Sequence, residues 1–499
     1  MTTNLVILPL ILPVLTALTL LLVGRSRFWR RWLTGVSVLV QLTVALGFVA
    51  ATYQLPPLML PAAGWAAPFG IVLVIDQLTA LMLALGAMLA LAAINFGFAE
   101  MPTRRTHPLR APLIQFMMTG INLSFITGDL FNLFVGFEVM LIASYALLTL
   151  EADDFDIRQA FPYLAINLFG STIFLVAAGF AYTIFGSLNF AQIALVGSQM
   201  AGDPRITVLG LLLLLVFGLK SGLFPLYYWL PNSYPILPAP VAALYAGLLT
   251  KVGIYVMIRV FGQVLPPGLT LVYQCLGWMA AATMIFGALG AISRNSIRGI
   301  LSFQVITSIG SIALAVSFFT EYAFTAAIFY VLQDIMVKSS LFLIGGSIGV
   351  LNDTDNLDRT GGLWKAAPLL GVLFLLQAFS LAGLPPLSGF WGKYMIVTEG
   401  ARLGHWIYIT CVLVAGLLTT FSMLRIWLTT FWRDEAEAGG HIDHDDLRWK
   451  PMTIIIAVMT LISLGFGLGA DHLLQLSAEA SHQVFDRAAY IRHILEVRP

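Results

Sequence analysis

One pattern repeats along the chain: apolar runs of about twenty residues, separated by short joints that contain glycine, proline or charge. A helix of that length crosses the hydrocarbon core of a bilayer and satisfies its own backbone hydrogen bonds. Only 10% of the 499 residues are charged, against about 25% in soluble globular proteins, and 59% are hydrophobic. The alternating ten-residue segments typical of transmembrane β-barrels are not found. The sequence therefore predicts an all-α, polytopic membrane protein.

The apolar runs and the breaks between them predict about fourteen spans. Their approximate bounds are 4–23, 33–52, 71–98, 111–127, 129–150, 160–185, 206–230, 237–262, 270–292, 297–316, 321–350, 367–398, 404–431 and 452–470. No basic residue precedes the first run, so we expect a retained helix and not a cleaved signal peptide. The joint 186–198 is expected to be a loop. The tail after Asp471 is expected to form an amphipathic helix that packs on a partner or on the membrane surface.

The basic residues of the joints and of the span ends indicate the orientation. If the N-terminus lies outside, sixteen lysines and arginines fall on the cytoplasmic side and six on the opposite side. The positive-inside rule therefore places both termini outside the cytoplasm.

The remaining four basic residues all lie within predicted spans, and all four are lysines. They are Lys220, Lys251, Lys338 and Lys393, in a chain that has only six lysines. A lysine can lose its proton when it is removed from water, whereas an arginine in practice cannot. The pattern therefore indicates amines that titrate within the membrane.

The span 129–150 carries a carboxylate near its centre. Glu138 lies about 14 Å along the helix from Asp129, close to the middle of a core about 30 Å thick. A charge at that depth costs at least about 2.5 kcal/mol. We therefore expect Glu138 to have a functional partner among the lysines. A structural ion pair is the alternative interpretation, both here and for each lysine.

Two of the lysines lie beside helix breakers. Lys220 has a glycine two residues to either side and is followed by Pro225, and Lys393 follows Pro385 and Pro386. Proline removes a helix hydrogen bond, so the seventh and twelfth spans should be broken. Paired broken helices are typical of inverted-repeat transporters, and spans 4–8 and 9–13 would form two inverted five-helix repeats.

Other charges have less distinctive surroundings. Asp334 precedes Lys338 by one helical turn, which is the favourable direction for an ion pair. Asp129 and Asn132 are candidate cation ligands, because Na⁺ prefers oxygen. The segment HIDHDD (441–446) could bind a divalent metal, but we expect a solvated loop. Cys275 and Cys411 are expected to be core residues, and no metal site, cofactor or nucleic-acid partner is predicted.

Several motifs together resemble a known family. Four segments resemble the antiporter-like membrane subunits of respiratory complex I and their relatives. They are the span with Glu138, GLKSGLFPLYYWLPNSYP, LLTKVGIY and LAGLPPLSGFWGK. Within that group, two segments resemble the D subunits of Mrp-type multisubunit Na⁺/H⁺ antiporters: TGDLFNLFVGFEVMLIASYALL and GWAAPFGIVLVIDQLTALML. The length of the chain also fits those subunits. The resemblance covers essentially the whole chain.

The resemblance implies fourteen helices, two inverted repeats and a hydrophilic axis along the midplane. It implies that Glu138 and Lys220 form a coupled acid–amine pair and that Lys251 is a connecting amine. It also implies that Lys338 is the central relay and Lys393 the terminal relay. Relatives often carry a histidine five residues before the relay lysine, where this chain has Gln333. Proton transfer there would depend on Asp334 or on water. The implied setting is a bacterial inner membrane, with other hydrophobic subunits as partners and H⁺ and Na⁺ as cargo.

The predicted organisation is a three-helix segment (1–110), a first repeat (111–262), a second repeat (263–431), and a loop, last helix and tail (432–499). One alternative function is a proton-pumping subunit of a complex I-like or hydrogenase-type redox complex. A second is a membrane enzyme that holds Mg²⁺–pyrophosphate with EADDFD or NDTDNLD, which would leave the four lysines unexplained.

Overall fold

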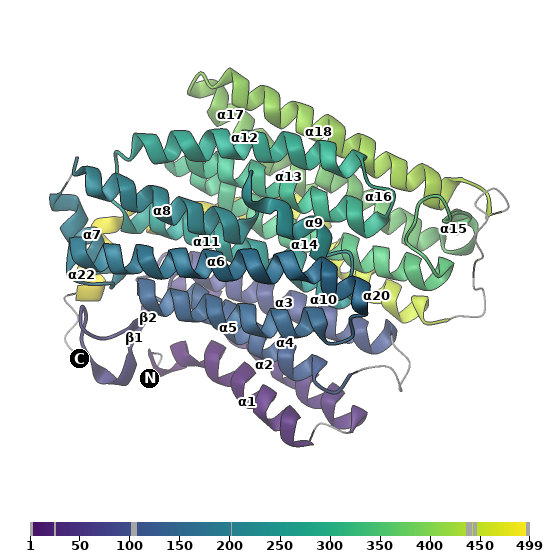
Figure 1. Cartoon of the computed structure of the whole chain (residues 1–499), viewed down its shortest axis with the longest axis horizontal. Coiled ribbons are helices and arrows are strands. Elements are labelled where there is room, and N and C mark those ends of the chain that lie inside the picture. The colour runs from purple at the N-terminus through teal and green to yellow at the C-terminus, as the bar shows by residue number, and fades with distance from the viewer. Residues whose placement is uncertain are drawn as a thin grey trace.

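A computed structural model describes residues 3–23, 26–100, 107–200, 202–435, 442 and 447–495. In this part of the chain, long helices run side by side along the longest axis of the molecule (Figure 1). Twelve of them are long and apolar enough to cross a membrane. Helix α4 (Arg110–Ile126) and the pair α16 (Pro368–Ala382) and α17 (Ser388–Arg402) are shorter. The total of fourteen spans therefore stays a prediction.

The remaining helices of the N-terminal half are η1 (Thr3–Ile7), α1 (Leu8–Val23), α2 (Arg27–Thr52), η2 (Ala62–Gly64), α3 (Gln77–Glu100), α5 (Leu130–Thr149), α6 (Asp154–Phe185), α7 (Phe190–Gln199), α8 (Pro204–Ser221), η3 (Leu226–Trp229), α9 (Leu230–Ser233), α10 (Ala239–Leu244), the π-helix η4 (Tyr245–Leu249), α11 (Thr250–Arg259) and the π-helix η5 (Val260–Val264). The expectation of a loop at 186–198 was wrong. Asn189 caps the N-terminus of α7 by accepting hydrogen bonds from two backbone N–H groups, so a short helix forms there.

The C-terminal half contains α12 (Thr270–Ile292), α13 (Ile297–Ser317), α14 (Glu321–Asn352), α15 (Leu363–Ala366), α18 (Trp406–Ile426), the π-helix η6 (Trp427–Trp432), α20 (Trp449–Leu468), α21 (Ala470–Phe485) and α22 (Arg487–Leu495). The tail is therefore helical, as expected, but α21 packs against α3 and α14 of this same chain. Apart from Ile442, the HIDHDD segment lies outside the described residues.

The predicted all-α class is confirmed, and the described chain adds one small hairpin to its helices. Strand β1 (Leu58–Pro61) pairs antiparallel with β2 (Val72–Ile75), with Leu58 opposite Ile75. The span expected at 71–98 therefore begins as a strand, and the helix starts at Gln77. Four apolar residues in succession, VLVI, fit a buried strand as well as a helix, so periodicity could not distinguish the two.

The two expected helix breaks are confirmed. Helix α8 ends at Gly222 (φ 82°), and α16 ends at Gly383 (φ 89°). Both glycines adopt a left-handed conformation that costs a glycine little, and a proline follows each by three residues. Pro225 and the Pro385–Pro386 pair thus lie within the breaks.

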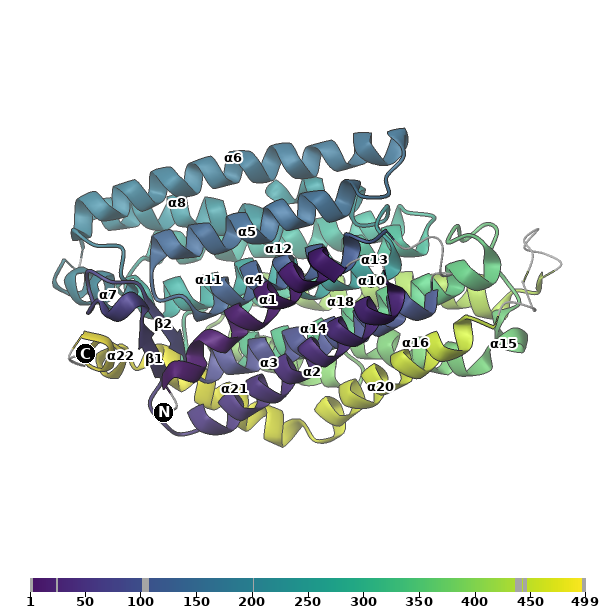
Figure 2. The ribbon, with the colours of Figure 1, turned by 90° about the horizontal axis from the view of Figure 1, so that it is seen from below.

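Three segments form the centre of the bundle. In the stretch Ala239–Val264 and in helices α13 and α14, every residue of the most apolar 18-residue segment is buried. In α1 and α2, 28% of the residues of the corresponding segment are buried. Helix α1 lies at the lower edge of the bundle in Figure 1 and α6 at the upper edge in Figure 2, where the β-hairpin lies at the same end as the two chain termini. We call this end the hairpin end. The opposite end, where α2 begins at Arg27 and α13 begins beside Arg298, is called the basic end.

Candidate functional site

The helices that carry the five candidate charges form a continuous row. Glu138 is on α5, which contacts α6; α6 contacts α8, and the contacts continue from α8 to α11, α14 and α17. Lys220, Lys251 and Lys338 expose 3%, 0% and 0% of their surface, and Lys393 is half-buried. The fold therefore brings the four lysines onto successive neighbouring helices.

Glu138 and Lys220 are joined through a third side chain. The hydroxyl of Ser171 on α6 donates a hydrogen bond to Oε1 of Glu138. The amine of Lys220 in turn donates to Oγ of Ser171 at 3.0 Å and to the carbonyl of Asn167 at 3.1 Å. A serine hydroxyl is both a donor and an acceptor, so this arrangement is a short hydrogen-bonded path from amine to carboxylate.

Lys251 is paired with an acid from another helix. Its Nζ lies 2.8 Å from Oδ2 of Asp334 and donates a hydrogen bond to the carbonyl of Ala246 at 2.6 Å. Both charged side chains are completely buried. The π-helix η4 supplies that carbonyl, and irregular helical turns of this kind often occur at functional sites.

The ion pair expected between Asp334 and Lys338 is not formed. Nζ of Lys338 has no hydrogen-bond partner among the described residues, although the side chain is fully buried. The crossing of α11 and α14 instead places the carboxylate of Asp334 against Lys251.

Lys393 bridges the second helix break. Its Nζ donates to the carbonyls of Leu381 and Ala382, at 2.9 and 2.8 Å, which are the last two residues of α16. These carbonyls have no partner within their own helix, and the C-terminus of a helix attracts positive charge. Gln333 lies beside the same break, where its Oε1 accepts a hydrogen bond of 3.5 Å from Ser388.

Two glycines allow the row to close. A Cβ on Gly253 would lie 2.3 Å from Oγ of Ser221. Ser221 directly follows Lys220 in the sequence, and Gly253 follows Lys251 by two residues. A Cβ on Gly247 would lie 2.4 Å from Oγ of Ser339, the residue after Lys338. The backbones at these two crossings are too close for any larger residue.

The candidate cation ligands lie at the hairpin end and have structural partners. Oδ1 of Asp129 accepts a hydrogen bond of 2.8 Å from the backbone of Asn132, which caps α5, and Nδ2 of Asn132 donates to Thr127. Asn132 precedes Glu138 by six residues, or about 9 Å along the helix. These residues and Glu138 do not form one cluster. Within the described ranges, no group of three or more acids, histidines and cysteines is arranged to hold a metal ion.

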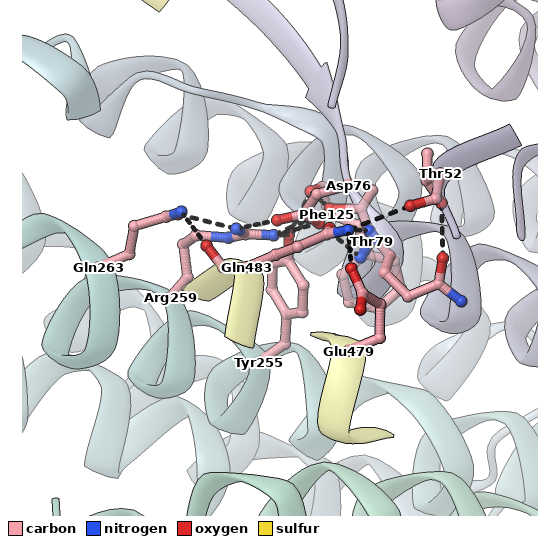
Figure 3. A network of polar contacts seen from close by, with 10 residues as sticks. Thr52, Asp76, Thr79, Phe125, Tyr255, Arg259, Gln263, Glu479 and Gln483 are labelled. Atoms are coloured by element: carbon pink, nitrogen blue, oxygen red, sulfur yellow. Dashed lines mark hydrogen bonds and ion pairs between the residues drawn. The ribbon is translucent and has the colours of Figure 1, made fainter. Parts of the chain in front are cut away.

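A buried polar network at the hairpin end was missed by sequence reasoning (Figure 3). The guanidinium of Arg259 contacts both carboxylate oxygens of Asp76 and donates to Thr79 and Tyr255, each at 3.0 Å. Arg259 lies near the end of the expected span 237–262 and was counted among the six basic residues of the non-cytoplasmic side, yet it exposes 5% of its surface. One signal was present: Lys251, Tyr255 and Arg259 are spaced four residues apart and therefore share one face of α11.

The tail encloses this network. Gln483 of α21 accepts a hydrogen bond from the backbone N–H of Gln77 at 2.9 Å and donates to the carbonyl of Thr52 at 3.1 Å. Gln263, which accepts a hydrogen bond from Arg259, also donates to the carbonyl of Gln483. Residues from the first and last parts of the chain thus meet around one ion pair.

The fold and this row of charges define a class: polytopic helical membrane proteins whose broken helices bring ionisable side chains together in the membrane. Residues 127–419 match the family described as "NADH:quinone oxidoreductase/Mrp antiporter, TM". The chain belongs to that family.

Individual relatives agree with this assignment. The chain is 36% identical to the D subunit of the Na(+)/H(+) antiporter of Alkalihalophilus pseudofirmus and 35% identical to that of Bacillus subtilis, in each case over 99% of both chains. It matches a chain in the structure of the Mrp complex from Dietzia sp. DQ12-45-1b with a TM-score of 0.90 and 29% identity, again over 99% of both chains. The resemblance to Mrp D subunits is therefore confirmed, and these relatives are named as transporter subunits.

Proposed function

We propose that this chain is the proton-carrying subunit of a multisubunit cation/proton antiporter. Protons would move along the row Glu138, Lys220, Lys251, Lys338 and Lys393 by way of hydroxyls and water. One observation carries the proposal: four buried or half-buried amines lie on successive neighbouring helices, and a carboxylate is connected to the first of them. An ordinary membrane core would have no use for so many charges at this depth.

The acid at the start of the row would act as an electrostatic switch. Burial favours the neutral form of an amine, and a nearby carboxylate favours its charged form. A small movement of Glu138 relative to Ser171 would therefore change whether Lys220 holds or releases its proton. Moving one charge against 100 mV costs about 2.3 kcal/mol, which an interaction of this kind can supply.

The second half of the row would act as a relay. Asp334 pairs with Lys251 and precedes Lys338 by one helical turn, so a change of side-chain conformation would let its carboxylate stabilise a proton on either lysine in turn. Gln333 cannot titrate, so it would orient water beside the second break. Lys393, held by the carbonyls of α16, would be the terminal relay, with Pro225, Pro385 and Pro386 maintaining the breaks.

The coupling cation is proposed to be Na⁺, moved either here or in a partner subunit. The names of the relatives support this choice. Asp129 and Asn132 stay candidate ligands, although their capping role competes with that function. The basic end is proposed to face the cytoplasm in the cell membrane, with both termini outside, in line with the positive-inside rule.

The test is proton flux in inverted membrane vesicles that contain the complete complex. Glu138→Ala and Lys220→Ala should each abolish cation-dependent proton flux while the complex still assembles. Unchanged flux in either assembled variant would refute the proposal. Iron–sulfur proteins among the co-purified subunits would instead support the redox-driven alternative.

A further inference from the structure

A cavity at the basic end reaches the helix that carries Lys338. It has a volume of about 490 Å³, enough for on the order of ten water molecules. Its rim is charged: Glu100 at the end of α3 and Asp353 line it, together with Arg298, which pairs with Asp355 at 2.9 Å. A charged rim on a cavity of this size favours water and attracts small cations.

One wall of this cavity is bare helix. Gly345, Gly346 and Gly349 of α14 line it, and a Cβ on Gly349 would have no atom within 4 Å. The cavity therefore lies directly against the α14 backbone.

The cavity and the central lysine share one face of α14. Gly345, Gly349 and Asn352 follow Lys338 by seven, eleven and fourteen residues, which are nearly whole numbers of helical turns. Asn352 is 5% exposed, and its Oδ1 has no hydrogen-bond partner among the described residues. The Lys338 amine is likewise unpartnered. Burying an amine without a protein partner is unfavourable unless water reaches it.

On α14 itself, the two residues that occupy this face between the cavity and the lysine are Leu341 and Phe342. Leu341 and Phe342 are 1% and 0% exposed, and they separate Gly345 from Lys338 over an axial distance of about 10 Å. Short apolar constrictions of this kind gate pores by alternately wetting and drying.

The hairpin end also has a cavity, of about 640 Å³ and lined by Gln483 and Tyr490, but among the described residues neither Lys251 nor Arg259 lines it. The face of α11 that continues from Lys251 ends in the Asp76–Arg259 ion pair, which α21 covers through Gln483 (Figure 3). This buried ion pair, which is also hydrogen-bonded to Thr79 and Tyr255, occupies that route.

We propose that the cavity bounded by α3, α10, α13 and α14 is the aqueous access route from the basic end to Lys338, and that Leu341 and Phe342 form its gate. The Asp76–Arg259 pair seals the hairpin end of the neighbouring α11 face. The inference rests on the proposed function for its cargo, but the route itself can be tested without measuring transport.

The test uses single cysteines in the complete complex, with Cys275 and Cys411 replaced by serine. Leu341→Cys and Leu343→Cys form a matched pair, because both leucines are buried and point to different faces of α14. A membrane-impermeant, cationic thiol reagent should label Leu341→Cys and Gly349→Cys, and should leave Leu343→Cys unlabelled. Lys365→Cys, whose native side chain is 81% exposed at the basic end, identifies the side from which labelling must occur.

Three outcomes would overturn the route: equal labelling at 341 and 343, no labelling at 349, or labelling of 341 from the side opposite to Lys365→Cys. If Leu341→Cys does not assemble, Phe342→Cys replaces it on the same face. Once attached to the cysteine at position 341, the positively charged reagent should reduce proton flux several-fold. If labelling follows the expected pattern while Lys220→Ala keeps full flux, the route stands and the proposed function fails.

Discussion

A single hydroxyl connects the acid of this chain to its first amine. Ser171→Ala would remove both hydrogen bonds that join Glu138 to Lys220. A hydrogen bond to a charged group is worth about 1.5–3 kcal/mol, or at least about a tenfold change in an equilibrium. We expect cation-dependent proton flux in inverted vesicles to fall about tenfold or more.

The neighbouring Thr172 provides the control for that variant. It is exposed, and among the described residues its hydroxyl bonds only to the carbonyl of Leu168 in its own helix. Thr172→Ala should therefore leave flux unchanged, and Ser171→Thr should restore most of it. Equal flux in the two alanine variants would exclude Ser171 from the path.

The same assay can test whether the central side chain, Lys338, must be an amine that can release its proton. Lys338→Arg keeps a positive charge but replaces an amine that can release its proton by a guanidinium that cannot. We expect flux to be lost while the complex assembles. Lys365→Arg, at an exposed ion pair with Asp434, should behave as the parent chain. Full flux through Lys338→Arg would mean that this position does not exchange protons.

The sequence predicted which residues carry charge into the membrane, but not which residues they meet. Lysines stand out against an apolar background because their burial is expensive. The partner of Asp334 could not be predicted in the same way, because the choice between Lys338 and Lys251 depends on how α11 and α14 cross. Ser171 carries no distinguishing signal at all, since a serine in a membrane helix usually bonds to its own backbone.

At the level of helices, the row depends on close backbone contact between α8 and α11. In Gly253→Ala the new methyl would lie 2.3 Å from the hydroxyl of Ser221, so the two helices must separate. Overpacking typically costs about 1–3 kcal/mol. We expect a lower melting temperature of the purified complex and reduced proton flux, because Lys220 and Lys251 flank this contact.

Gly179→Ala on α6 is the matched control. A Cβ at that position has open space around it, and alanine favours a helix over glycine. Its melting temperature should be unchanged or slightly higher. A similar loss of stability in both variants would contradict the close-contact explanation.

Helix breaks could be predicted from the sequence because glycine and proline act locally. Gly222 with Pro225, and Gly383 with Pro386, end their helices through their own backbone preferences. The strand Val72–Ile75 could not be predicted, because its conformation depends on pairing with Leu58–Pro61 across a turn. The local sequence there is equally apolar in either state.

Over the whole molecule, one ion pair joins distant parts of the chain. Asp76→Asn would leave the guanidinium of Arg259 buried without its counter-charge, and such a loss costs about 3–5 kcal/mol. We expect a clear fall in the melting temperature of the detergent-solubilised complex. Asp203→Asn, at an exposed pair with Arg205, should cause no measurable change.

A double variant separates charge from packing at this site. In Asp76→Leu with Arg259→Met both charges are removed, so most of the lost stability should return. If the double variant is no more stable than Asp76→Asn, the network depends on its hydrogen bonds to Thr79 and Tyr255 more than on charge balance. The spacing of Lys251, Tyr255 and Arg259 indicated a shared helix face, but the pairing of Arg259 with Asp76 depends on tertiary contacts that no local pattern reveals.

The contacts of Gln483 have a consequence for biosynthesis. Its side chain bonds to backbone groups of Gln77 and Thr52, which precede it by 406 and 431 residues. Chains generally fold from the N-terminus as they leave the ribosome. Here the end of α2 and the start of α3 cannot form these hydrogen bonds until Gln483, near the end of the chain, has been translated. Ribosome-bound chains that stop before α21 should therefore hold these early helices in a loosely ordered state, and the first-made part of the protein should be among the last to become fixed.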